Sequence, residues 1–257
     1  MLIATWNVNS IRPRLEQLGA WVRTAAPDVL CVQETKVTDD LFPHAELEAL
    51  GFTHRAIWGQ KTYNGVALLS RHPIADVQIG FADPEPSGQS RFIRGTIGGI
   101  TLLNVYIPNG SEVGSEKFFY KLDWLARLQT ELARMDPTTD VLLCGDFNIA
   151  PTDADAYDPF ETEGTLLCSK PERDALKQLE AWGFVDAWRK KSPFATEYSW
   201  WPYTGGGFKK NQGFRIDHIF VTRSLMKRCT AARIDREPRR AEKPSDHAPV
   251  IAKFLPA

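Results

Sequence analysis

An acidic residue and an amide residue, Asp146 and Asn148, follow directly on the apolar run at residues 141–144. The four apolar residues predict a buried strand that ends at Gly145, although periodicity alone does not exclude a buried helical segment. Residues i and i+2 of an extended chain point to the same face, so Asp146 and Asn148 are expected to project together. Open sheets place their sites at such strand ends, but Asp and Asn are also common turn residues. Alone, the pair fits a functional site and an ordinary turn equally well.

Polar side chains able to bind a metal ion or a phosphate also stand at the ends of other apolar runs. They are Asn7, Glu34, Asn104 with Tyr106, Asp217, and Asp246 with His247. Each one has a plain explanation, because strand-end Asn and Asp residues form turns and Glu is usually solvated. Turn chemistry does not require the pattern to recur at six strand ends. Carboxylate and amide oxygens suit Mg²⁺ or Mn²⁺, so the pattern favours a metal site.

Histidine could supply acid–base chemistry, and His247 is the best candidate among the five histidines. It follows Asp246 and precedes a run that begins at Pro249, and a carboxylate distant in sequence is expected to orient it. His218 adjoins Asp217 but would point to the opposite face of a strand, which predicts a packing role. The remaining histidines have no acidic partner nearby and are predicted to be surface or structural residues; they are His44, His54 and His72.

The elements that must position these residues alternate between helices and strands. Strands are predicted at residues 2–8, 29–34, 65–70, 74–79, 91–97, 100–106, 141–144, 215–222 and 249–254. Helices are predicted at residues 10–25, 42–50, 117–135 and 172–182, and a long loop at residues 151–169. Because some strands are joined by hairpins, for example through Gly98 and Gly99, the pattern indicates an α+β sandwich of two packed sheets with helices outside. Residues 1–257 are predicted to form one domain.

Composition places the chain among ordinary soluble globular proteins, with 43% hydrophobic and 25% charged residues. The net charge of −1 does not by itself indicate a nucleic-acid partner, but a local basic patch would be enough to bind one. No CxxC motif occurs, which argues against a zinc site and indicates reduced, buried thiols. With no secretory signal pattern and no membrane-spanning apolar run, we expect a cytoplasmic protein without a membrane partner. The four cysteines are Cys31, Cys144, Cys168 and Cys229.

Seven short motifs, in their order along the whole chain, resemble the exonuclease III family of the endonuclease/exonuclease/phosphatase superfamily. That family contains abasic-site endonucleases and 3′-exonucleases of DNA repair. The motifs GDFN and SDH recur across the superfamily, whereas QETK, YIPNG and RID are narrower and favour the DNA enzymes. The motifs are TWNVN at 5–9, VQETK at 32–36, NGVA at 64–67, VYIPNG at 105–110, GDFN at 145–148, RIDH at 215–218 and SDH at 245–247.

The resemblance implies a four-layer α/β/β/α sandwich of two mixed, largely antiparallel sheets, with the site at one sheet edge. It implies that Asp146 orients the attacking water, that Asp217 pairs with His247 beside the scissile phosphate, and that Glu34 binds Mg²⁺, for which Mn²⁺ substitutes. The implied catalytic residues are Tyr106, Asp146, Asn148, Asp217 and His247. The implied metal-site residues are Asn7, Glu34, Asp146, Asn148, Asp246 and His247. Whether the histidine acts as a base or stabilises the phosphate stays open.

A segment rich in aromatic, glycine and basic residues, 199–215, is a candidate DNA-binding surface. By the resemblance, Trp200 and Phe214 wall a deoxyribose pocket, and a mobile loop meets the DNA groove. The plain alternative is a set of core tryptophans followed by a solvated loop, and it suits Trp201. The basic stretch at residues 233–243 fits phosphate contact and a solvated charge run equally. The predicted DNA contacts are Trp200, Lys209, Lys210, Phe214 and Asn109.

The loop around Leu167 departs from the family pattern. In the family this loop approaches the extruded abasic sugar, and a small residue often stands near this position. A leucine is expected to narrow the pocket, so that abasic-site cleavage is weak while processing of 3′ ends survives.

The leading hypothesis is a Mg²⁺-dependent DNA-repair phosphodiesterase that acts on duplex DNA as exodeoxyribonuclease III and abasic-site endonuclease and also cleans 3′ ends. Specialised 3′-end processing with weak abasic-site activity is the first alternative, and a phosphatase or phospholipase of the same fold is the second. A binding module without catalysis is a third class, and the complete residue set argues against it. We expect a monomer, because a duplex must have access to the sheet edge where the site is predicted.

Overall fold

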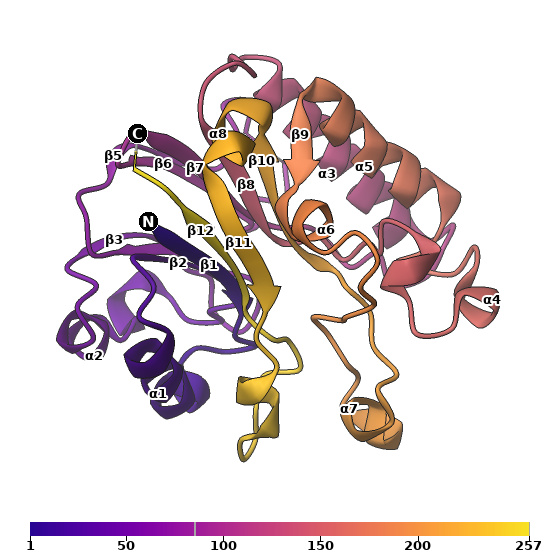
Figure 1. Ribbon diagram of the computed structural model, residues 1–257, viewed down its shortest axis with the longest axis horizontal. Coiled ribbons are helices and arrows are strands. Elements are labelled where there is room, and N and C mark those ends of the chain that lie inside the picture. Colours follow the sequence, from indigo (N-terminus) through magenta and orange to yellow (C-terminus); the bar gives the residue numbers. More distant parts are fainter. Residues whose placement is uncertain (85, 257) are drawn as a thin grey trace.

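Two six-stranded sheets pack face to face, and helices cover their outer faces (Figure 1). The computed structural model describes residues 1–84 and 86–256. Helices α1 (Leu15–Ala25) and α2 (His44–Ala49) lie outside one sheet, while α3 (Glu116–Leu132) and α5 (Lys170–Trp182) lie outside the other. This is the α+β sandwich of four layers that the sequence predicts.

The first sheet contains both ends of the chain, with strand order β11-β12-β1-β2-β4-β3. β1 and β2 are parallel and the other neighbours are antiparallel. Its strands are β1 (Leu2–Asn7), β2 (Val29–Gln33), β3 (His54–Trp58), β4 (Val66–Ser70), β11 (Cys229–Ile234) and β12 (Val250–Phe254).

The second sheet has the order β5-β6-β7-β8-β10-β9, and only β7 and β8 are parallel. Both sheets are therefore mixed and largely antiparallel, as expected. Its strands are β5 (Ala75–Ile79), β6 (Phe92–Ile97), β7 (Ile100–Tyr106), β8 (Val141–Asp146), β9 (Phe184–Asp186) and β10 (Asp217–Thr222).

The predicted end of the central strand is wrong by two residues, because β8 continues through Gly145 to Asp146. A side chain at Gly145 would begin 1.9 Å from the Val105 carbonyl oxygen, and Gly145 has a φ of +142°. Glycine therefore lets β8 pass close to β7 where a larger residue would collide. Asp146 consequently leaves the sheet at a position held on both sides, by Tyr106 of β7 and Asp217 of β10.

The predicted long loop at residues 151–169 contains short helical turns at Asp153–Asp155 and Pro159–Thr162 (α4). Its end is the start of α5, where Ser169 and Glu172 form a reciprocal capping box that sequence reading did not use. Three further short helices are α6 (Ala187–Lys191), α7 (Gly207–Lys210) and α8 (Arg223–Arg228). None of the helices in the described residues is both long and apolar enough to cross a membrane.

Three apolar clusters hold the layers together. One lies between the sheets, one between the second sheet and helices α3 and α5, and one between the first sheet and helices α1 and α2. Central strands are thus buried on both faces, which explains why they read as continuous apolar runs. The strand ends carrying Asn7, Tyr106 and Asp146, and the start of β10 at Asp217, meet at one edge of the sandwich.

Candidate active site

Glu34, Asp146 and His247 converge at this edge from three separate elements. One potential ligand atom from each lies within 4.8 Å of the others, so the three side chains could hold a metal ion together. Glu34 follows β2, Asp146 ends β8, and His247 precedes β12. Asp146 and His247 are buried and Glu34 is partly buried, which strengthens the electrostatic interactions among them.

Asn7 braces the two carboxylates from beneath. Its side-chain amide nitrogen donates to Glu34 Oε1 and to Asp146 Oδ2, both at 2.9 Å, and its Oδ1 accepts from the Asn9 backbone at 2.9 Å. In this arrangement Asn7 donates to both carboxylates and holds them together. Its place at the metal site stays a prediction.

Asp217 supplies the distant carboxylate that orients His247. His247 Nδ1 lies 2.9 and 3.1 Å from the two Asp217 oxygens, and Nε2 lies 3.7 Å from Asp146 Oδ2. Burial opposes the charged form, but Asp217 and Asp146 outweigh it and raise the pKa of His247 to about 10. His247 is therefore an imidazolium at neutral pH, with Nε2–H facing the cluster.

The remaining predicted catalytic side chains surround Asp146. Burial, with Glu34 and Asp146 adding to it, raises the pKa of Tyr106, so the phenol stays protonated and able to donate. The Asn148 backbone N–H donates to Asp146 Oδ1 at 2.9 Å. The Asn148 side chain donates to the Ile107 carbonyl and accepts from Asn109, both at 3.0 Å. Burial raises the pKa of Asp146 to about 7, and a bound cation would favour its ionised form.

Asp246 is adjacent to His247 in the chain but is not part of the three-residue cluster, and its place among the metal-site residues stays a prediction. Its two oxygens accept from the Asn9 amide and from the Trp200 indole, each at 2.9 Å. Burial raises its pKa, but the charge of His247 and these hydrogen bonds outweigh burial and hold the pKa of Asp246 below its usual range. Asp246 therefore connects Trp200 to Asn9, which lies in the loop after β1.

Sequence reasoning missed Lys36, which lies against the Glu34 carboxylate. Its ammonium is 2.6 Å from Glu34 Oε2 and 2.6 Å from Asn9 Oδ1. Glu34 and Lys36 both have left-handed backbone angles, with φ of +53° and +54°. Such strain gathers at functional sites and is not readable from residue type. The available signal was the lysine's place inside the QETK motif.

An aromatic wall stands beside His247. Trp200 lies 6.4 Å from the His247 ring and 5.9 Å from the Phe214 ring, measured between centroids. Leu167 is 7% exposed and belongs to the apolar cluster against which both aromatic side chains pack. Trp201 is fully buried, so the plain core explanation holds for it. Leu167 thus lies at the wall of the predicted sugar pocket.

The basic residues divide into exposed and supporting groups. Lys209 and Lys210 are exposed on α7 at the tip of a protruding hairpin (Figure 1). Arg236 and Arg239 instead stack on the aromatic side chains of that hairpin, with Arg239 4.9 Å from the Phe208 ring centre. Arg239 also donates to the Ser245 carbonyl at 2.6 Å. The basic stretch therefore supports the site loops in part, and is not simply a solvated charge run.

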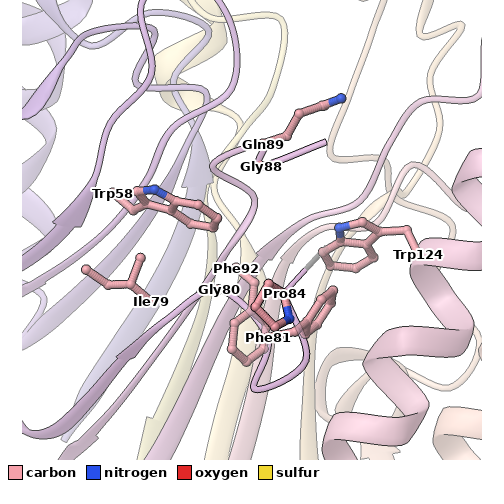
Figure 2. A pocket seen from close by; sticks show the side chains of 9 residues that line it. All are labelled: Trp58, Ile79, Gly80, Phe81, Pro84, Gly88, Gln89, Phe92 and Trp124. Carbon is pink, nitrogen blue, oxygen red and sulfur yellow. The ribbon is translucent and has the colours of Figure 1, made fainter. Parts of the chain in front are cut away.

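An apolar cavity of about 160 Å³ lies elsewhere, between the end of β3 and helix α3 (Figure 2). Trp58 and Trp124 face it from opposite sides, with Phe81 beneath. Neither Glu34, Asp146 nor His247 lines it. The polar cluster thus lies apart from this cavity.

His218 lies on the face of β10 opposite Asp217, as its position in the strand predicts. Arg215 donates to Nδ1 at 3.0 Å, which leaves Nε2 to donate to the Ile149 carbonyl at 2.9 Å. Burial, and secondarily the charge of Arg215, lower the pKa of His218 to about 4. The neutral ring thus separates the buried Arg215 from the aromatic core around Phe147.

This environment predicts an acid-sensitive contribution to stability. The unfolded chain protonates His218 near pH 6.5 and the folded protein only near pH 4, so unfolding is favoured as pH falls between these values, by up to about 3 kcal/mol. His218→Gln keeps an acceptor and a donor but does not titrate. Urea unfolding at pH 7.0, 5.5 and 4.5 should show a smaller loss for the variant, and parallel losses in the two proteins would contradict the assignment.

The comparisons with known proteins agree with this geometry. A sequence profile of the Endonuclease/Exonuclease/phosphatase family matches residues 4–247. Exodeoxyribonuclease III of Haemophilus influenzae is 37% identical, over 99% of this chain and 100% of its own. The solved structure of the 3′ phosphatase NExo from Neisseria, bound to a product DNA hairpin, has a TM-score of 0.95 at 41% identity and covers 99% of both chains. An AP endonuclease from Archaeoglobus fulgidus has a TM-score of 0.94 at 40% identity, also over 99% of both chains.

Proposed function

We propose that this chain, which belongs to the endonuclease/exonuclease/phosphatase family and is a DNA-repair nuclease, is a divalent-metal-dependent phosphodiesterase acting on duplex DNA at 3′ ends and at abasic sites. The observation that carries the proposal is the convergence of Glu34, Asp146 and His247 at one edge of the sandwich, with Asp217 behind the histidine. The three relatives named above are an exodeoxyribonuclease III, a 3′ phosphatase and an AP endonuclease. Their substrates share a phosphate ester at a DNA 3′ position.

The donor set fits a small, hard cation. Glu34 and Asp146 offer carboxylate oxygens a short distance apart, and Asn7 and Lys36 already neutralise part of their mutual repulsion. Glu34 and Asp146 would hold Mg²⁺ or Mn²⁺, which would neutralise a non-bridging phosphate oxygen and the leaving oxygen. We propose that Glu34 and Asp146 supply the ligands and that His247, the third member of the cluster, keeps its Nε2 proton and faces the substrate as a donor.

The proposed chemistry uses oriented protons around a water molecule. Asp146, held by Asn7 and by the Asn148 backbone, accepts a hydrogen bond from the attacking water and takes its proton. The imidazolium of His247, kept charged by Asp217, donates to a phosphate oxygen and stabilises the charge that develops there. Tyr106 and Asn148 provide neutral donors on the same side. The raised pKa favours a stabilising role for His247 over a role as base.

The duplex would bind over the edge of the sandwich that carries the cluster. Trp200 and Phe214 would wall the sugar pocket, and Lys209 and Lys210 would contact phosphates from the protruding hairpin. Asn109 reaches the site through its hydrogen bond to Asn148. We further propose that residues 1–257 act as a single-domain, cytoplasmic monomer.

Hydrolysis of three labelled duplexes tests the function. One carries an internal abasic site, one a recessed 3′ end, and one a 3′-phosphate at a nick. We expect cleavage of all three with Mg²⁺, loss of cleavage with a chelator, and recovery when Mg²⁺ or Mn²⁺ is restored. Mg²⁺ should also raise the melting temperature of the protein, because it binds only the folded state. Failure to process any duplex would overturn the proposal and direct attention to phosphorylated lipids or inositols.

One observation favours a narrower function, namely 3′-end processing with weak abasic-site cleavage. Leu167 fills space beside Trp200 and Phe214 and holds a left-handed backbone angle, with φ of +72°. In the three-duplex experiment this alternative predicts removal of the 3′-phosphate and digestion of the recessed end, with little incision at the abasic site.

A further inference from the structure

A buried ion pair lies directly behind the site, where no catalytic function requires a charge. Lys121 of α3 and Glu172 of α5 are in contact, and both side chains are fully buried. Buried pairs are costly to desolvate and contribute little to stability compared with apolar residues, so their retention calls for a specific role. Neither residue belongs to the cluster of Glu34, Asp146 and His247.

The lysine half of the pair holds two site loops through their backbone. The Lys121 ammonium donates to the carbonyl of Asn148 at 2.6 Å and to the carbonyl of Asn109 at 3.1 Å. Asn148 stands in the left-handed region, with φ of +51°. A charged donor fixed on its carbonyl helps to hold this left-handed conformation, which asparagine is among the few non-glycine residues to adopt.

The glutamate half holds the loop that carries Leu167. Glu172 Oε1 accepts from the Leu167 backbone at 3.2 Å, and Oε2 accepts from the backbone and hydroxyl of Ser169 at 3.1 and 2.5 Å. Each oxygen of the carboxylate is therefore used, and the ammonium has three acceptors. A fully satisfied buried network of this kind fixes one arrangement of the groups around it.

We propose that the Lys121–Glu172 pair is a positioning device that sets Asn148 for catalysis and locks it to the Leu167 loop. The inference rests on the proposed function, because it requires Asn148 to act on the substrate. The pair touches neither substrate nor metal and works through Asn148, so its removal lowers kcat more than it changes KM. A misplacement of about 1 Å at a reacting group is enough to slow catalysis by an order of magnitude or more.

The test is a double-mutant cycle with Asn148→Ala. The variant Lys121→Met/Glu172→Gln leaves no unpaired charge, and glutamine keeps an acceptor for the loop N–H groups. We expect single-turnover cleavage of the 3′-phosphate duplex to fall about 10-fold when Asn148 is present and by less than about twofold in the Asn148→Ala background. Lys170→Met/Asp174→Asn changes a solvent-facing pair on the same helix and should leave the rate unchanged.

Equal losses in both backgrounds, or a wild-type rate for the variant, would overturn the positioning role. Should the double variant unfold, Lys121→Arg enters the same cycle, because it keeps a positive charge opposite Glu172 but changes the donor geometry at the two carbonyl groups. The expected loss is then smaller but must again vanish with Asn148→Ala. Wild-type protein that cleaves no duplex would refute the proposed function, whereas an active wild type with an additive cycle would refute the positioning role alone.

Discussion

An Asp146→Asn variant is expected to hydrolyse the 3′-phosphate and abasic duplexes at about one thousandth of the wild-type rate, because it lacks the base that orients and deprotonates water. The side chain is 1% exposed and is held on three sides, by Asn7, by the Asn148 backbone and by His247. Asparagine has the same size, so the pocket keeps its shape. What is lost is the negative charge and the proton acceptor.

The measurement is single-turnover hydrolysis at saturating Mg²⁺, alongside binding of a duplex by anisotropy. Binding should be retained or improved, since one negative charge beside the phosphate is removed. Asp123→Asn on α3 is the matched control, an exposed carboxylate in a surface ion pair whose loss should be nearly neutral. A rate for Asp146→Asn within tenfold of wild type would exclude Asp146 as the base and leave the water to another group.

Strands buried on both faces could be predicted from the sequence, whereas only one of the four strands at sheet edges, β5, could be. The central strands β7 and β8 are continuous apolar runs because they lie between two apolar layers. β3 and β11 were missed because they border solvent and carry His54 and Arg55, or Thr230 and Arg233, at half-buried or exposed positions. The three-residue β9 is too short for any periodicity.

The sequence indicated which residues are candidates for the site, but not which of them contact one another. Polar residues at strand ends pointed to the edge of the sandwich, since parallel and antiparallel neighbours bring those ends together. The sequence could not show that Asp246 bonds to Trp200 instead of joining the cluster. That choice depends on side-chain directions after a turn. The left-handed backbone of Glu34 and Asn148 was equally hidden, because neither is glycine.

Lys121 shows a further limit of sequence reasoning. It lies on the buried side of an amphipathic helix, at a position that pattern reading assigns to solvent because lysine is rarely buried. Its partner Glu172 was readable as a capping residue of α5 and nothing more. Only the packing of α3 against α5 turns two ordinary helical charges into a single buried pair behind the site.

A Leu167→Gly variant is expected to raise abasic-site cleavage relative to 3′-phosphate removal by about 10- to 100-fold, because it opens the sugar pocket beside Trp200 and Phe214. The effect is specific to the abasic substrate, whose extruded sugar would enter that space. A 3′-phosphate at a nick needs no extrusion, so its removal should change little. Leu167 would then be the residue that sets the balance between the two activities.

The stability cost of this change is expected to be moderate. Removing a buried leucine side chain costs about 2–5 kcal/mol. The backbone at residue 167 is left-handed, with φ of +72°, a conformation that costs a residue with a side chain about 1–2 kcal/mol. Glycine adopts it freely, so the net loss in the free energy of unfolding should be about 1–3 kcal/mol. Urea unfolding measures that loss and shows whether the assayed protein is folded.

Two companion variants separate pocket size from backbone freedom. Leu167→Ala opens the pocket almost as far but keeps the strained backbone, so it should produce most of the gain in abasic cleavage with a larger loss of stability. Leu167→Met keeps the volume filled and should leave the activity ratio as in wild type. If all three variants cleave the two substrates in the wild-type ratio, the leucine does not limit entry of the abasic sugar. The balance of activities must then depend on contacts to the duplex outside this pocket.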